Sequence, residues 1–335
     1  MNKADIQQYL CAHKAITDQY PIKVSDYYLS LIQEKGDGIW NQCMPDRAEL
    51  ENPENLCDDG LGEQAQSPCR RLIHRYPDRA LIFATNCCYT YCRFCFRKRF
   101  WKNGNQESAI NDRELQDITS YLSRKTEIKD VLLSGGDPLT LPDGRIREIL
   151  QQIFAVKTVE TVRLCTRAPV VQPQRITTEL ADMLAGFPAL WIMTHFNHPA
   201  ELTEPAMTAI SMLRKKGIPI LNQTVLLKGV NDDEETLCHL FRGLVRHGVK
   251  PHYLFHCDPI RGTAHFATGI ERGLDILKYF RTNLSSIATP FFAIDLPEGG
   301  GKVSLQPDYR DQNACEGTYC SIDGRSIFHP LCLKK

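Results

Sequence analysis

From Ala80 onward, short apolar runs alternate with longer amphipathic segments, and this alternation constrains the fold more than any other feature of the chain. The apolar runs cover residues 80–85, 130–134, 161–165, 190–196, 219–227, 251–256 and 290–296. A segment with helical periodicity follows each of the first six runs. Six or seven such repeats predict an α/β fold whose parallel strands curl into a partial or full (β/α) barrel, with polar residues at the strand ends forming the site. A doubly wound sheet stays open as an alternative, because periodicity does not establish closure.

The same pattern divides the chain of 335 residues into three parts. Residues 1–70 are polar and interrupted by prolines, and they predict an N-terminal helical cap with helices around Lys3–His13 and Ser25–Glu34. Residues 71–310 form the expected barrel core. Residues 311–335 form a short cysteine-rich tail.

Charge and hydropathy narrow the class of protein. The chain has 40 Lys and Arg against 40 Asp and Glu, and a net charge of zero argues against a nucleic-acid partner bound through charge alone. No apolar run approaches the ~18 residues that a membrane span requires, and the first residues lack the apolar core of a signal peptide. We therefore expect a soluble, cytoplasmic protein that binds no membrane.

The chain contains fourteen cysteines, more than a chain of this length usually has. Because no export signal is present, ligation of a metal or cluster by thiolates explains them better than disulfides do. Cys88, Cys92 and Cys95 follow the apolar run 80–85 with the spacing C-x3-C-x2-C. Three thiolates on one loop can hold three irons of a [4Fe–4S] cube and leave the fourth iron open. A structural zinc site would add a fourth ligand nearby. We interpret the adjacent Cys87 as a bystander.

Further motifs lie at the ends of later strands. They are Ser134-Gly135-Gly136-Asp137-Pro138, Thr194-His195-Phe196-Asn197-His198-Pro199 and Glu298-Gly299-Gly300-Gly301-Lys302. Together with the cysteine loop they make the chain resemble the lysine 2,3-aminomutase family of radical S-adenosylmethionine enzymes, over roughly residues 70–310. The resemblance implies that the three cysteines hold the cluster and that its open iron binds S-adenosylmethionine. An electron, from a donor such as flavodoxin or ferredoxin, then generates a 5′-deoxyadenosyl radical.

The resemblance also assigns contacts to S-adenosylmethionine. The implied residues are Ser134, Gly135, Gly136, Asp137, His195 and Gln223. Two glycines in succession would let the backbone approach a ligand closely. The alternative for this segment is a tight turn between strand and helix, and a single His or Gln is more often a core polar group.

The glycine-rich segment before Lys302 is not a phosphate-binding loop. That motif requires a glycine where Leu296 stands and a Ser or Thr where Val303 stands. The resemblance implies instead that Lys302 forms a Schiff base with pyridoxal 5′-phosphate, although the family form has Gly in place of Glu298.

Phosphate anchoring would fall to the segment His74-Arg75-Tyr76-Pro77-Asp78-Arg79, which matches the family at Arg75, Tyr76 and Arg79. The two arginines could equally be surface charges. The family has a tyrosine where this chain has Phe255, which removes one expected hydroxyl contact to the cofactor.

Three charged residues bear on the substrate. Arg97 matches the family arginine that pairs with the substrate carboxylate, and Asp258 and Asp295 match the two carboxylates that receive the side-chain ammonium of lysine. Two buried carboxylates need a cation between them, which favours a basic L-amino acid and lysine foremost. The implied reaction is a radical shift of the α-amino group to the β-carbon. Arginine or ornithine, or lysine modification of an elongation factor, are alternative substrates and roles.

The tail contains Cys315, Cys320 and Cys332. Their loose spacing leaves zinc binding, an auxiliary iron–sulfur cluster and free thiols as alternatives, and leaves a homo-oligomer open. A protein that is not an enzyme, such as an iron–sulfur electron carrier or a cysteine-rich binding module, would explain the cysteine loop. This alternative would not explain the motifs around Gly135, His195 and Lys302.

Overall fold

In the computed structural model of the protein, residues 3–104 and 106–329 are described. Nine strands form one sheet whose spatial order follows the chain. The strands are β1 (Leu72–Tyr76), β2 (Arg79–Thr85), β3 (Asp130–Gly135), β4 (Thr161–Cys165), β5 (Leu190–Thr194), β6 (Ile220–Leu226), β7 (Lys250–His256), β8 (Phe291–Leu296) and β9 (Gly301–Leu305). Strands β2 to β8 are parallel, and β1 and β9 run antiparallel at the two ends.

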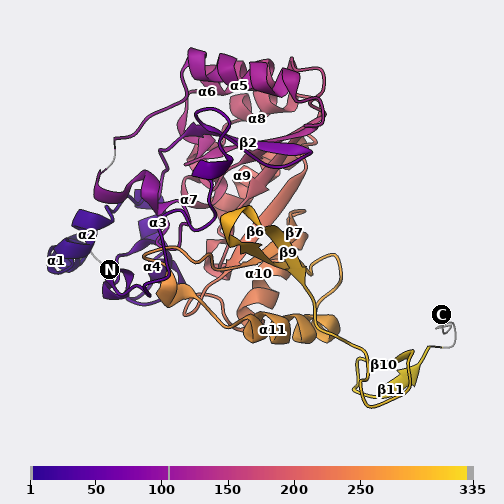
Figure 1. Cartoon of the computed structure of the whole chain (residues 1–335). Coiled ribbons are helices and arrows are strands. Elements are labelled where there is room, and N and C mark those ends of the chain that lie inside the picture. Colours follow the sequence, from indigo (N-terminus) through magenta and orange to yellow (C-terminus); the bar gives the residue numbers. More distant parts are fainter. Residues whose placement is uncertain (1–2, 105, 330–335) are drawn as a thin grey trace.

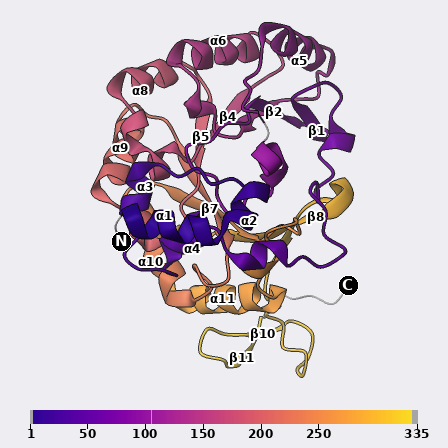
Figure 2. The ribbon, with the colours of Figure 1, turned by 90° about the vertical axis from the view of Figure 1, so that its left-hand side faces the viewer.

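Because each strand lies beside its predecessor without any reversal of order, the doubly wound alternative is wrong and the sheet is a curled barrel. Helices cover its outer face, as Figure 2 shows from one end. They are α5 (Asp112–Arg124), α6 (Asp143–Phe154), α7 (Ala168–Val171), α8 (Thr178–Ala185), α9 (Glu204–Lys215), α10 (Glu234–Arg246) and α11 (Ile270–Asn283). The predicted alternation of strands and helices is confirmed.

Strand β6 shows how sequence alternation creates both a core and a site. Ile220 and Leu226 are buried in the main hydrophobic core, whereas Gln223 and Val225 line the central cavity. Successive side chains of a strand point to opposite faces. Strands that face helices on one side and the barrel interior on the other therefore combine apolar packing with polar groups aimed inward.

The two end strands were not predicted. Strand β9 is glycine-rich at its start and mostly exposed, so it lacks an apolar pattern. The end strands β1 and β9 are not paired with each other, but side-chain contacts connect β1 to β9 and to the neighbouring β8. The Tyr76 hydroxyl accepts a hydrogen bond from the Lys302 backbone N–H over 2.7 Å, and Arg75 lies 3.6 Å from Asp295. The barrel is thus nearly closed.

The N-terminal part is helical and packs on the barrel (Figure 1). It contains α1 (Lys3–Ala12), α2 (Lys14–Gln19), α3 (Asp26–Ser30) and α4 (Gly38–Cys43). The helix expected over Ser25–Glu34 is shorter than predicted. Tyr28, Trp40 and Met44 belong to the same hydrophobic core as the barrel strands, so this part is anchored by apolar burial.

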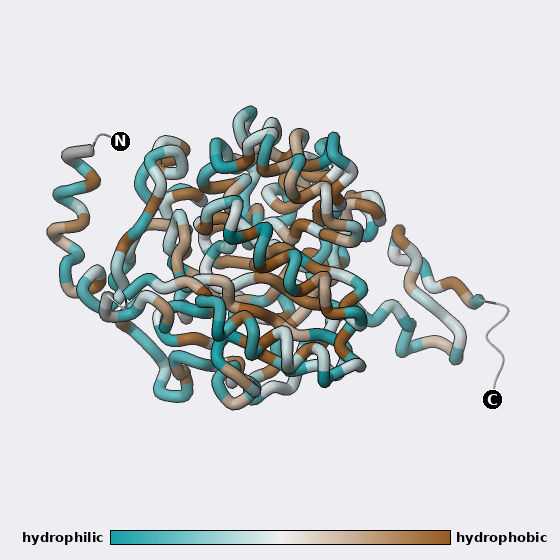
Figure 3. The backbone as a smooth tube through the Cα atoms, turned by 90° about the horizontal axis from the view of Figure 1, so that it is seen from above, coloured by the Kyte–Doolittle hydropathy of each residue, from teal (hydrophilic) through white to brown (hydrophobic). Residues whose placement is uncertain are grey.

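At the other end of the chain, β10 (Thr318–Cys320) and β11 (Ser326–Phe328) form a hairpin that stands away from the barrel (Figures 1 and 3). Arg281 on α11 donates a hydrogen bond to the Cys320 carbonyl over 2.8 Å. Within the two described ranges, every helix is too short or too polar to cross a lipid bilayer.

Candidate active site

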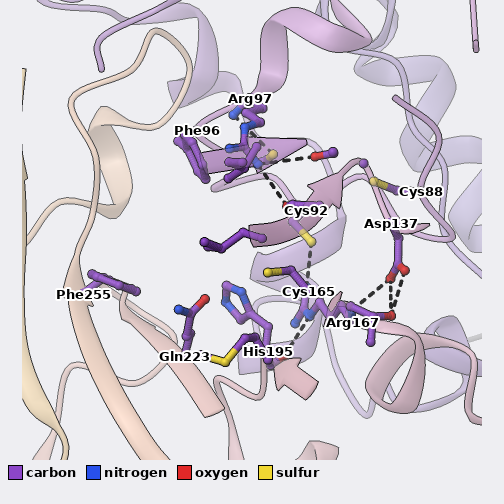
Figure 4. A pocket seen from close by; sticks show the side chains of 18 of the residues that line it. Cys88, Cys92, Phe96, Arg97, Asp137, Cys165, Arg167, His195, Gln223 and Phe255 are labelled. Atoms are coloured by element: carbon purple, nitrogen blue, oxygen red, sulfur yellow. Dashed lines mark hydrogen bonds between the residues drawn. The ribbon is translucent and has the colours of Figure 1, made fainter. Parts of the chain in front are cut away.

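A cavity of about 490 Å³ lies inside the barrel and is bordered by strands from both ends of the sheet (Figure 4). Its lining includes every residue predicted to bind a cofactor or substrate, except the tail cysteines. These residues are Arg75, Tyr76, Arg79, Cys88, Cys92, Cys95, Arg97, Ser134, Gly135, Gly136, Asp137, His195, Gln223, Asp258, Asp295 and Lys302. Segments more than 200 residues apart in the chain therefore meet at one site.

The cysteine loop after β2 is held by contacts that alternate with its cysteines. The Tyr91 backbone N–H donates to the Lys23 carbonyl over 2.7 Å, and that of Arg93 donates to the Gln42 carbonyl over 2.9 Å. The buried Arg93 side chain pairs with Glu49 at 2.5 Å. These two positions bind the N-terminal part, while Cys92 between them, and Cys88 and Cys95 on either side, border the cavity.

Two of the three thiols, those of Cys88 and Cys95, lie in a water-poor environment. Burial raises the pKa of Cys95 to about 11, and burial and its neighbours Cys95, Asp137 and Cys92 raise the pKa of Cys88 well above its usual value. Thiols that raise one another's pKa need positive charge to become thiolates, and iron supplies that charge. In the described ranges no three His, Cys, Asp or Glu side chains are gathered as ligands of one metal ion. Cysteine thiolates are the usual ligands of iron–sulfur clusters, so the chemistry of this donor set fits a cluster.

Two glycines at the end of β3 bring this strand close to the chain itself. A Cβ on Gly135 would lie 2.2 Å from the carbonyl oxygen of Thr85, which ends β2, and one on Gly136 would lie 2.1 Å from that of Cys87 in the cysteine loop. Gly135 also has a φ of +134°, which side chains rarely adopt. The tight-turn interpretation therefore explains much of the motif, and contact with S-adenosylmethionine stays a prediction.

Asp137 is likewise engaged within the protein. Its carboxylate accepts hydrogen bonds from the Thr166 hydroxyl at 2.7 Å and from the backbone N–H groups of Arg167 and Leu139 at 2.8 and 3.0 Å. Burial raises the pKa of Asp137. This carboxylate ties the end of β3 to the end of β4, which aligns the loops around the cavity.

His195 differs from Asp137, because no described residue hydrogen-bonds to its buried ring nitrogen Nε2. The same holds for the hydroxyl of the preceding Thr194. Burial and the charge of Arg167 lower the pKa of His195 to about 3, so the imidazole is neutral. Since unpartnered buried polar atoms are costly, these two fit a site that a polar ligand completes. Gln223 points toward the same space (Figure 4).

Arg97 is already paired, which the sequence did not indicate. Its guanidinium lies 2.7 Å from the buried carboxylate of Glu63, which also contacts Arg99. Burial alone would raise the pKa of Glu63, but Arg97 and Arg99 lower it to about 2. Nη1 of Arg97 contacts Ser134 Oγ more weakly, over 3.4 Å. Glu63 lies in a loop without periodicity, so only the fold reveals this partner.

The opposite wall of the cavity carries the two aspartates and Lys302. The Lys302 ammonium lies 2.9 Å from Asp295 and 5.0 Å from the centre of the Phe255 ring. Within residues 3–104 and 106–329, Asp258 forms no such ion pair. Burial and the nearby charge of Asp295 raise the pKa of Asp258 to about 7, and the more distant charges of Lys302 and Arg97 offset only part of this rise. The wall therefore offers one carboxylate that is paired with a cation and one that forms no ion pair with the described residues.

The segment predicted to anchor a phosphate has mixed surroundings. Arg75 donates to Gln66 Oε1 over 2.6 Å, and Arg79 stacks on the Tyr76 ring at 3.9 Å. Both arginines border the cavity, so they are not merely surface charges.

In the tail, Cys315 is exposed, Cys320 lies on β10, and Cys332 lies outside the described residues. Zinc binding there stays a prediction.

Comparisons with known proteins agree with this geometry. The Radical SAM superfamily model matches residues 82–241. A protein of Aquifex aeolicus is 46% identical over 87% of this chain and 79% of its own length. The L-lysine 2,3-aminomutase of Acetoanaerobium sticklandii is 39% identical over 88% of this chain and 72% of its own length. The glutamate 2,3-aminomutase of Clostridioides difficile is 40% identical over 88% of this chain and 70% of its own length.

Proposed function

Because the chain belongs to the lysine 2,3-aminomutase family of radical S-adenosylmethionine enzymes, we propose that it is an isomerase that moves the α-amino group of L-lysine to the β-carbon. One observation carries the proposal. A single cavity is bordered by the three loop cysteines, by Lys302 and by a pair of aspartates. No iron–sulfur carrier or binding module needs that combination.

Each cofactor of this family has a fitting set of residues here. When bound, the cluster and S-adenosylmethionine supply a carbon radical that removes hydrogen, and pyridoxal phosphate supplies the carbonyl group that carries the migrating nitrogen. Cys88, Cys92 and Cys95 would ligate the cluster. The neutral His195 imidazole offers a hydrogen-bonding nitrogen to S-adenosylmethionine. Lys302 offers its amine to the pyridoxal carbonyl, and Arg75 and Arg79 offer positive charge to the phosphate.

The choice of lysine rests on the charges of the cavity. Asp258 forms no ion pair with the described residues and its pKa is raised, so the ammonium of a lysine side chain would supply the cation that it needs. Across the cavity, Arg97 keeps the Nη1 end of its guanidinium free of carboxylate contacts, since Glu63 occupies Nε and Nη2. A substrate carboxylate at Nη1 and an ammonium at Asp258 would fix both ends of the molecule, which orients the reacting carbons between them.

We infer that a low-potential donor such as flavodoxin or ferredoxin delivers the electron past Cys88. This residue borders the cavity and also a second hollow that is lined by Lys23 and Cys87. We place the enzyme in the cytoplasm, where such donors are kept reduced. The exposed Ile322 and Phe328 of the C-terminal hairpin support a homo-oligomer in which a second copy covers them.

The decisive experiment is an anaerobic incubation of the reconstituted enzyme with a reductant, S-adenosylmethionine and single amino acids. Lysine, ornithine, arginine and glutamate are compared, and β-amino isomers are detected by mass spectrometry after derivatisation. We expect β-lysine as the main product. If the enzyme converts ornithine or arginine in preference to lysine, that amino acid is the substrate and the choice of lysine is wrong. Full cluster and pyridoxal content without any β-isomer would reject the mutase assignment.

A further inference from the structure

Arg167 lies immediately beyond β4, outside every motif considered above, and its side chain reaches the cysteine loop. Its Nη1 atom is 2.8 Å from Cys92 Sγ, and the residue is buried (Figure 4). We propose that Arg167 sets the reduction potential of the cluster by donating a charged hydrogen bond to the Cys92 thiolate. The proposal rests on the assignment of Cys92 as a cluster ligand.

The guanidinium is fixed on its remaining sides. Nη2 donates to Gln42 Oε1 at 2.6 Å, to Glu201 at 2.7 Å and to the Tyr28 hydroxyl at 3.1 Å. Nε donates to the His195 carbonyl oxygen at 3.1 Å. These partners come from the N-terminal helices and from the loop after β5. The N-terminal part therefore positions an arginine that the barrel presents to the cysteine loop.

The direction of the effect follows from charge. Reduction adds an electron to the cluster and its thiolates, so a positive group bonded to a ligand sulfur stabilises the reduced form more than the oxidised form. The guanidinium is permanently charged and its surroundings are poor in water, which strengthens the interaction. Glu201 offsets part of this charge but contacts Nη2, on the side away from the sulfur. The expected consequence is a cluster that is easier to reduce.

A spectroscopic test uses the unaltered enzyme. Protein made with arginine labelled with ¹⁵N in the guanidinium group is reconstituted, reduced and examined by pulsed electron paramagnetic resonance. We expect a weak ¹⁵N coupling to the reduced cluster, absent from Arg167→Lys made with the same label. Arg97 keeps its label in that variant, so a coupling from Arg97 would persist there and is distinguished from that of Arg167. A full cluster signal without an Arg167-dependent coupling would overturn the inference and leave the proposed function intact. Absence of a reducible cluster in the parent enzyme would instead reject the proposed function.

A redox titration supplies the second measurement. Arg167→Gln should make the midpoint potential more negative, so that at a fixed solution potential the ratio of reduced to oxidised cluster falls about tenfold, or ~59 mV. The matched control is Arg175→Gln. Arg175 is also partly buried beyond β4, but it donates to the carbonyls of Leu139 and Leu141 and contacts no cysteine. Equal potentials in parent and Arg167→Gln would contradict the proposal. If Arg167→Gln holds no cluster, the ¹⁵N coupling decides the question.

Discussion

The Tyr76 hydroxyl accepts a hydrogen bond from the backbone N–H of Lys302 across 2.7 Å, and this contact joins the first strand of the sheet to the last. Tyr76 ends β1 and Lys302 is the second residue of β9. The contact fixes the backbone beside the amine that would bind pyridoxal phosphate. The contact that connects the two end strands of the barrel therefore also positions this lysine.

Replacement of Lys302 by alanine should abolish covalent capture of pyridoxal phosphate without loss of the cluster. The hydrogen bond from residue 302 to Tyr76 uses the backbone, so the variant keeps it. The measurement is borohydride reduction followed by peptide mass spectrometry, with iron and sulfide content as the control. A pyridoxyl group still attached to the chain at the parent level would refute the assignment.

Replacement of Asp258 by asparagine should weaken lysine binding by ~2–5 kcal/mol, the usual loss when one member of a buried charge pair is removed. Lysine binding is measured by calorimetry with the holoenzyme. Norleucine, which lacks the side-chain ammonium of lysine, is the control ligand, and it should bind to the parent and to the variant with equal affinity. Unchanged lysine affinity would show that the cation site is elsewhere.

The pH dependence of kcat/KM for lysine should carry an acidic limb near pH 7. The pKa of Asp258 is raised to about 7, so below this pH the carboxyl group is protonated and loses its attraction for the ammonium. Between pH 8 and pH 6 its ionised fraction falls about tenfold, and kcat/KM should fall with it. In Asp295→Asn the neighbouring negative charge is gone, so the limb should move to lower pH. A limb that stays in place would contradict the coupling of the two carboxylates.

Replacement of Glu63 by glutamine should destabilise the apoprotein by about 3 kcal/mol at pH 7, because Arg97 and Arg99 hold its pKa at about 2 in the folded state against 4.5 ordinarily. Because the pKa of Glu63 is lower in the folded state, ionised Glu63 stabilises the fold at any pH above its ordinary pKa of 4.5. This stabilisation is lost as the pH falls toward 2. Urea unfolding at pH 7, 5 and 4 should show the difference shrinking. The exposed Glu148, paired with Arg145, is the control, and its Gln variant should change by under ~1 kcal/mol.

Replacement of Glu298 by glycine should leave stability unchanged or raise it slightly. Glu298 has a φ of +55°, a conformation that costs a non-glycine residue about 1–2 kcal/mol, while glycine adds about 0.5–1 kcal/mol of entropy to the unfolded chain. Thermal unfolding compares it with Glu148→Gly inside α6, which should lose about 1 kcal/mol. An equal loss in both variants would show that Glu298 makes contacts that outweigh its strain.

Apolar periodicity and motif spacing were sufficient to predict the architecture and to name residues that border one cavity. Apolar runs at strand spacing predicted β2 to β8, because strands covered by helices must be apolar on the covered face. The C-x3-C-x2-C spacing and the motifs around Gly135, His195 and Lys302 named residues that the fold gathers around one cavity. Periodicity and motif spacing involve residues that are close in the sequence, so they can be recognised without the structure.

The tertiary structure alone decided how these groups are paired. Glu63 on Arg97, Arg167 on Cys92 and Lys302 on Asp295 are contacts between segments that no periodicity links, except that the last pair lies on neighbouring strands. The glycines at the end of β3 let this strand approach the backbone of Thr85 and Cys87 closely. Charges and close approaches of this kind depend on distances of a few ångströms between distant segments, and only packing of the whole barrel fixes those distances.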